Sequence, residues 1–242
     1  MVGQNHRFSR EHPTPHYHKL IEFYKQLHQN GGLFQNHIGG DEVVSIPPEN
    51  MFDGAGLLYF TLPIKRISQR NGARSILDYG SGKGIQYDKN RTMIDGKPVD
   101  MRDYWGVDEI NVFDPGLSDK AAPVAADGVI STDVLEHCFH ADIPWIVEEI
   151  FSLAEKFVWC NIDCFKAHKL LPNGENVHIT VREPAYWQGV FETVGNRYRS
   201  IDWEIGCRHH LDQNPSDQAR VMTYYRRPQV EAEINEQTRF VR

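Results

Sequence analysis

The sequence lacks long hydrophobic runs, a basic excess and a phosphate-gripping glycine motif. No apolar stretch approaches the roughly 18 residues that suggest a transmembrane helix, and residues 1–7 carry no signal-peptide core. The net charge of −7 argues against a broad nucleic-acid surface, because such surfaces are built from clustered Lys and Arg. We therefore expect a soluble, cytoplasmic protein with neither membrane nor nucleic acid as a partner.

Cysteine is also scarce. The chain has 4 cysteines in 242 residues, at no disulfide-like spacing, which fits a reducing compartment. Cys160, Cys164 and His168 are spaced i, i+4, i+8, which would suit a metal only on one continuous helix. Because Cys160 falls in an expected strand, we predict no metal site. The length suits one large α/β domain and is too short for two comfortable ones.

Two glycine- and acid-containing motifs organise the chain. Residues 75–84 read Ser-Ile-Leu-Asp-Tyr-Gly-Ser-Gly-Lys-Gly, an apolar run that ends in an acid and continues into alternate glycines. This pattern predicts a buried parallel strand followed by a ligand-binding turn. It differs from the dinucleotide fingerprint G-x-G-x-x-G, and the absence of G-K-[ST] excludes a P-loop. Residues 127–137 read Asp-Gly-Val-Ile-Ser-Thr-Asp-Val-Leu-Glu-His, and predict a strand over 128–132 with Asp133 capping a short helix.

Taken together and in this order, the motifs resemble class I S-adenosylmethionine-dependent methyltransferases, and the second resembles their ubiquinone-biosynthesis-like branch (methyltransferase domain 11 type). The resemblance covers roughly residues 55–226. It implies an α/β fold with a Rossmann-like, doubly wound sheet of seven strands in the order 3-2-1-4-5-7-6, with strand 7 antiparallel and helices on both faces. It also implies S-adenosyl-L-methionine as cofactor and methyl transfer to O or N of a small-molecule acceptor.

The same resemblance assigns the cofactor-binding residues. Backbone amides of the glycine turn would meet the cofactor carboxylate, and Asp78 would hold its ammonium directly or through water. An acid after the second strand would accept bonds from the ribose hydroxyls. The residues implied are Asp78, Gly80, Ser81, Gly82, Gly84, Asp114, Thr132 and Asp133. For the ribose, Asp108 in a Gly-Val-Asp phrase rivals Asp114; we prefer Asp114 because β-branched and aromatic residues lead into it.

Methyl transfer from a sulfonium is an in-line displacement, in which positioning can supply up to about 7–11 kcal/mol. A general base matters for a hydroxyl acceptor and less for an amine or thiolate. His178 and His137 are the candidates, because histidine titrates near neutrality; a capping or packing role is the alternative for each. Two other functions stay open: an S-adenosylmethionine enzyme of another class (aminopropyl transfer or lyase chemistry), and a non-catalytic cofactor-binding module.

The rest of the chain predicts three regions. Residues 1–50 form an arm, a helix over 17–28 and a loop, serving either as a lid over the substrate or as a helix packed on the sheet. Residues 51–228 form the methyltransferase domain, and 229–242 a charged tail. The domain's further elements are helices over 56–70, 142–154 and 184–194, strands over 110–114, 157–162, 198–205 and 220–226, a vestigial third strand around 122–125, and two substrate-side segments, a hairpin insertion over 88–103 and a loop over 165–182.

Overall fold

The computed structural model describes residues 8–36, 42–89, 92–117, 122–210 and 220–227. The predicted tail lies outside these ranges. Within them, the main sheet has six strands in the order β11-β10-β8-β7-β3-β6. Their bounds are β3 Ser75–Tyr79, β6 Glu109–Phe113, β7 Ala126–Thr132, β8 Ala154–Asp163, β10 Asp202–His210 and β11 Arg220–Arg226. Neighbouring strands are parallel except β11, which runs antiparallel to β10.

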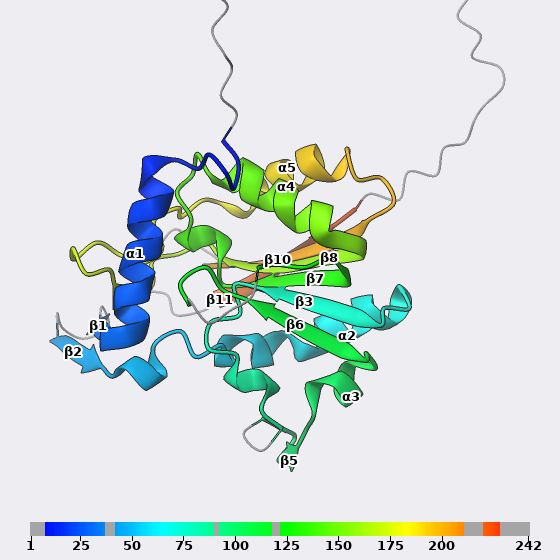
Figure 1. Ribbon diagram of the computed structural model, residues 1–242, viewed down its shortest axis with the longest axis horizontal. Helices are drawn as coiled ribbons and strands as arrows, with labels where there is room; N and C mark the ends of the chain where they lie inside the picture. Colours follow the sequence, from blue (N-terminus) through cyan, green and yellow to red (C-terminus); the bar gives the residue numbers. More distant parts are fainter. Residues whose placement is uncertain (1–7, 37–41, 90–91, 118–121, 211–219, 228–242) are drawn as a thin grey trace, which may run out of the picture.

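Helices cover both faces of this sheet (Figure 1). One face carries α4 (Ile143–Leu153) and α5 (Pro184–Gly195); the other carries α2 (Thr61–Arg70) and α3 (Met101–Trp105). Consecutive strand residues enter opposite cores, Leu77 packing in the α4–α5 core and Ile76 in the α2–α3 core, as the period of two in a strand requires. The predicted α/β sheet with flanking helices is confirmed.

The strand order differs from the expected one at both edges. The prediction placed strand 7 between strands 5 and 6, whereas β10 pairs directly with β8 and β11 lies outermost. The crossover through α5 brings the chain back beside β8, so the antiparallel return can pair only with the remaining edge of β10. At the other edge, 122–125 form no strand and β6 is outermost. A further strand parallel to β6 would need a crossover connection of about a dozen residues or more. The segment between β6 and β7 is too short to hold both that connection and the strand.

The N-terminal region contains more structure than the sequence indicated. The predicted helix is α1, Pro15–Asn30, capped by the Thr14 hydroxyl, which accepts from the Tyr17 N–H. The segment predicted as a loop instead forms an antiparallel pair, β1 (Gly32–Asn36) and β2 (Glu42–Ile46), and β9 (Lys169–Leu170) adds to β1. Because β2 is largely exposed on both faces, it shows no apolar alternation. In Figure 1, α1 stands at the end of the sheet, outside both helix layers.

The remaining elements agree with the sequence in type and differ in their limits. The helix expected over 56–70 begins as a 3-10 segment, η2 (Ala55–Phe60), and becomes α2 with Pro63 in its first turn, where a missing N–H is harmless. The inserted hairpin is present as β4 (Met93–Ile94) and β5 (Lys97–Pro98). The strand expected over 198–205 lies at 202–210. Among the described residues, no helix combines the length and apolarity that crossing a bilayer requires.

Gly128 in β7 tests the tightness of this core. A Cβ at this position would lie 2.1 Å from the ring of Phe157, which is fully buried. We expect Gly128→Ala to lower the free energy of unfolding by about 1–3 kcal/mol through overpacking. Gly189 is the matched control, because it lies on the exposed side of α5, and a Cβ added there would have no neighbouring atom within 4 Å. Gly189→Ala should stabilise by about 0.5–1 kcal/mol; urea unfolding that shows equal effects would contradict the packing argument.

Candidate functional site

A cavity of about 380 Å³ opens at the carboxyl ends of the central strands. Residues that follow β3, β6, β7 and β8 form its wall on the sheet side. Helix α1 forms another wall with Tyr17, Leu20, Ile21, Tyr24 and His28. Ligands of open α/β sheets bind at this edge. The N-terminal helix, which was expected either as a lid over the substrate or as a helix packed on the sheet, therefore forms part of the cavity wall.

The glycine turn after β3 contributes Gly80, Ser81 and Gly82 to the cavity wall. Gly80, Gly82 and Gly84 have φ of 88°, 56° and 74°, in the left-handed region that favours glycine. A Cβ on Gly82 would lie 2.3 Å from the Phe52 carbonyl oxygen. Glycine at this position is therefore required by the segment that packs on the turn, whether or not a ligand approaches it.

The backbone amides of this turn already have acceptors inside the protein. The N–H groups of Gly80 and Ser81 both donate to Phe113 O, and that of Gly82 donates to Asp114 Oδ2. The N–H of Lys83 donates to Phe52 O and that of Gly84 to Ser81 O, and all five bonds measure 2.7–3.2 Å. The expected contact between these amides and a ligand carboxylate therefore stays a prediction, and it would require the amides to exchange or share these acceptors. Lys169 is a cation that lines the same cavity, and burial lowers its pKa.

Asp78 does not line the cavity either. Its side chain is fully buried, and its Oδ2 accepts from the Tyr87 hydroxyl at 2.7 Å and from Gln86 Nε2 at 3.2 Å. Residues two apart in a strand share a face, so Asp78 points with Ile76 toward the α2–α3 side. Asp78, which was expected to hold the cofactor ammonium directly or through water, and Gly84 both lie outside the cavity lining.

The two rivals for the ribose position lie at opposite ends of β6. Asp114 follows the strand and lines the cavity; its carboxylate accepts from the Gly82 N–H at 2.9 Å and from the Gly116 N–H at 2.8 Å. Asp108 precedes the strand, is 64% exposed and forms an ion pair with Arg74 at 2.5 Å. Asp114 thus lies at the ligand-binding edge and is held in one orientation, whereas Asp108 is a surface residue.

Thr132 and Asp133 line the cavity at the end of β7, as predicted. Asp133 does not cap the helix that follows, η4 (Leu135–His137), whose N-cap residue is Val134. Its Oδ1 instead accepts from Asn161 Nδ2 at 2.6 Å, because the residue adopts φ of 55° and turns its side chain toward β8. Burial, and next the negative charge of Asp163, raise the pKa of Asp133 to about 6.

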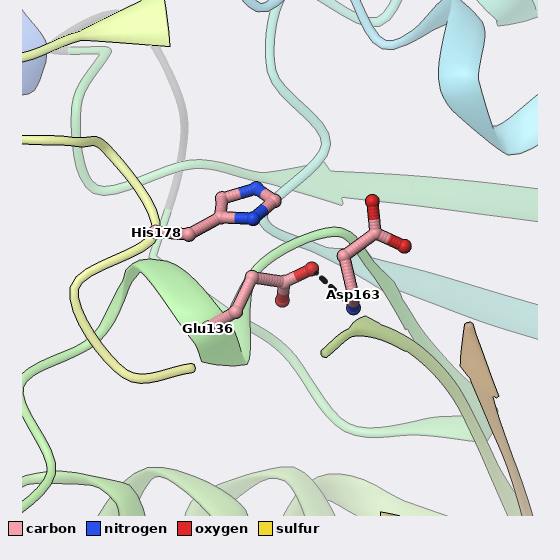
Figure 2. A group of neighbouring side chains, drawn as sticks. All are labelled: Glu136, Asp163 and His178. Carbon is pink, nitrogen blue, oxygen red and sulfur yellow. Dashed lines mark hydrogen bonds between the residues drawn. The ribbon is translucent and has the colours of Figure 1, made fainter. Parts of the chain in front are cut away.

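Two further carboxylates gather beside Asp133. Asp163 ends β8 and binds Arg208 through both oxygens, at 2.7 and 2.5 Å. Glu136 on η4 is fully buried; its Oε1 accepts from the Asp163 N–H at 2.7 Å, and its Oε2 has no hydrogen-bond partner among the described residues. Burial, and next the charges of Asp133 and Asp163, raise the pKa of Glu136 well above its usual range. Figure 2 shows Glu136 and Asp163 together with His178.

Both predicted histidines line the cavity, and their rings lie 4.7 Å apart. His178 Nδ1 is 2.6 Å from the Phe165 carbonyl oxygen, so Nδ1 carries the hydrogen and Nε2 keeps its lone pair. His137 Nδ1 is 2.8 Å from the Tyr24 hydroxyl oxygen. Burial lowers the pKa of each histidine, so both are neutral at pH 7. His178 thus has the geometry of a general base.

The sequence motifs did not predict several residues that line the cavity, namely Tyr24, Asp163, Lys169 and Arg208. Asp163 could have been predicted from the sequence, because it directly follows the apolar run of a predicted strand, as Asp114 does. Arg208 lies inside a strand and had none. The 165–182 loop lines the cavity as expected, but the 88–103 hairpin does not and lies beside α3, away from α1 (Figure 1). Cys160 lies in β8, so the Cys160–Cys164–His168 spacing does not fall on one helix.

No family model, no curated protein and no solved structure matches this chain. The family that the two motifs resemble therefore remains a prediction, and the function rests on the cavity itself.

Proposed function

We propose that this protein is an S-adenosylmethionine-dependent methyltransferase acting on a small-molecule acceptor. The observation that carries the proposal is the meeting of the two sequence motifs at one cavity: Gly80 to Gly82 and Asp114 on one side, Thr132 and Asp133 on the other. The volume, about 380 Å³, falls within the about 300–1,000 Å³ of small-molecule sites.

The cavity lining can hold the cofactor, but partly through other residues than the motifs predicted. A carboxylate can accept about four hydrogen bonds, and the Asp114 carboxylate, which accepts from the Gly82 and Gly116 amides, suits a ribose diol as a further donor. Asp53 and Asp133 line the cavity and can take the ammonium in place of Asp78. Lys169 can take the carboxylate in place of the turn amides. When bound, the cofactor supplies the activated methyl group.

The chain's own contribution to the reaction is to orient the reactants and hold a proton. His178 lines the same cavity, and the bond from its Nδ1–H to the Phe165 carbonyl oxygen fixes the ring and leaves Nε2 as the basic nitrogen. A hydroxyl acceptor would deliver its proton to this nitrogen. Because burial lowers the pKa of His178, the base stays neutral below the usual titration range of histidine, and the rate should hold into mildly acidic solution.

Calorimetry with S-adenosylmethionine and S-adenosylhomocysteine tests the proposal. We expect both to bind at one site per chain. Mass analysis of acceptor mixtures then separates methyl transfer from aminopropyl transfer or lyase chemistry, and binding without turnover would favour a cofactor-binding module. If folded protein binds neither compound, the proposed function is wrong.

A further inference from the structure

We propose that Glu136, Asp163 and His178 form a binding site for one divalent transition-metal ion at the inner end of the cavity. One ligand atom from each residue lies within 4.8 Å of the other two. An ion held at about 2.1 Å from each ligand allows a separation of about 4.2 Å, which small side-chain rotations supply. Figure 2 shows the three residues, which come from η4, the end of β8 and the loop before α5, next to one another, with the Asp163 carboxylate turned away from the other two side chains.

Each of the three residues is oriented by a second partner on its outer side. His178 Nδ1 donates to the Phe165 carbonyl oxygen, which leaves Nε2 as the ligand atom. Glu136 Oε1 accepts from the Asp163 N–H, and Asp163 binds Arg208 while each of its oxygens keeps one lone pair. Metal ligands in proteins are typically held in this manner, a histidine by a backbone carbonyl and a carboxylate by hydrogen bonds.

Glu136 Oε2 provides the independent indication of a missing ligand. This oxygen is buried and has no hydrogen-bond partner in the part of the chain that the structure describes. A buried polar atom without a partner is destabilising by about 1–3 kcal/mol in general, and natural proteins retain few of them. A cation bound by Glu136 gives this oxygen a partner once the carboxylate rotates, because the oxygen that faces Asp163 in Figure 2 is Oε1.

The surrounding charges also favour a cation. Asp133, Glu136 and Asp163 are three carboxylates that repel one another electrostatically, and the cations that act on them are Arg208 and Lys169. A divalent ion relieves the mutual repulsion of the carboxylates. One imidazole and two carboxylates suit Mn²⁺, Fe²⁺ or Zn²⁺ better than Mg²⁺ or Ca²⁺, which prefer all-oxygen sites.

The proposed metal site is open to the cavity on one side. Asp163 and His178 line the cavity, whereas Glu136 lies behind them. With three protein ligands, an ion has room for an oxygen of a bound molecule, which is the arrangement of catalytic rather than structural metal sites. The acceptor class that fits is a hydroxyl compound. With the ion bound, His178 Nε2 is a ligand and no longer a base, so the hydroxyl proton would pass to the Asp133 carboxylate in the cavity wall. This use of the ion rests on the proposed function, whereas metal binding itself does not.

Mn²⁺ titration of the EDTA-stripped full chain tests the site without any cofactor. Electron paramagnetic resonance of free Mn²⁺ counts the bound ions, and calorimetry gives the affinity. We expect one Mn²⁺ per chain, and a loss of at least about tenfold in affinity in Glu136→Gln and in His178→Asn. Mn²⁺ is preferred to Zn²⁺ here, because the exposed histidines His12, His16 and His18 can collect Zn²⁺.

Two exposed residues supply matched controls, Glu155→Gln and His140→Asn, and both should bind Mn²⁺ as the wild type does. Thermal unfolding separates metal binding from a structural role: stripped Glu136→Gln should melt at or above the wild-type temperature, because it removes a buried carboxylate, yet Mn²⁺ should no longer raise that temperature. The site is refuted if the wild type binds no Mn²⁺ at micromolar concentration, which would mean that Glu136 holds a proton instead, or if both variants bind as tightly as the wild type. S-adenosylhomocysteine binding in EDTA, measured in parallel, reports on the proposed function independently.

Discussion

Asp114→Ala should weaken the binding of S-adenosylhomocysteine by about 100-fold or more. Two hydrogen bonds from ribose hydroxyls to a carboxylate contribute about 1.5–3 kcal/mol each, and about 1.4 kcal/mol corresponds to tenfold in affinity. Asp114 is the carboxylate that lies at the end of β6 in the cavity wall. Calorimetry of the wild type and the variant measures the ratio directly.

Asp108→Ala is the matched control, because it removes the same group from the other end of the same strand. Asp108 is exposed and pairs only with Arg74 among the contacts described, so this variant should bind as the wild type does. Asp114 also accepts from the Gly82 and Gly116 amides, so Asp114→Asn is needed to separate ligand binding from local folding. The asparagine keeps one acceptor oxygen and should bind with intermediate affinity. Equal losses in Asp108→Ala and Asp114→Ala would contradict the assignment.

The central strands of the sheet could be predicted from the sequence, because buried parallel strands have a recognisable residue pattern. Runs such as 128–132 and 157–162 are apolar and bounded by turn residues, and both lie within observed strands, β7 and β8. Two acids, Asp114 and Asp133, follow predicted strands, and both reach the cavity, because the carboxyl ends of parallel strands meet at one edge.

The sequence could not predict which way a side chain points from its strand, or which distant elements pair with one another. Asp78 sits in the right motif, but the pleat of β3 turns it away from the cavity toward Tyr87. The β1–β2 pair is exposed and held by backbone hydrogen bonds, which leave no apolar pattern. The cluster of Glu136, Asp163 and Arg208 joins η4, β8 and β10, three elements distant in sequence. Only the fold brings such residues together.

The second large effect is expected at Arg208. Arg208→Ala should lower the free energy of unfolding by about 3–5 kcal/mol at pH 7, because breaking a buried ion pair leaves an uncompensated charge. Arg208 binds Asp163 through both carboxylate oxygens and lies 4.0 Å from Asp133. Arg74→Ala is the matched control: its pair with Asp108 is 71% and 64% exposed, so its loss should cost about 1 kcal/mol or less. Urea unfolding measures both.

The loss in Arg208→Ala should shrink as the pH falls. Asp133 has a pKa raised to about 6 in the folded protein, and the positive charge of Arg208 holds that pKa down. Without Arg208 the folded-state pKa rises further above its unfolded value near 3.9, so the folded state binds more protons than the unfolded state over a wider range. Stability of such a protein increases as the pH falls through that range. Unfolding at pH 7 and pH 5 should therefore show a smaller difference between variant and wild type at pH 5, because protonated Asp133 no longer needs the guanidinium. A difference that is the same at both pH values would mean that Arg208 stabilises the fold by packing alone.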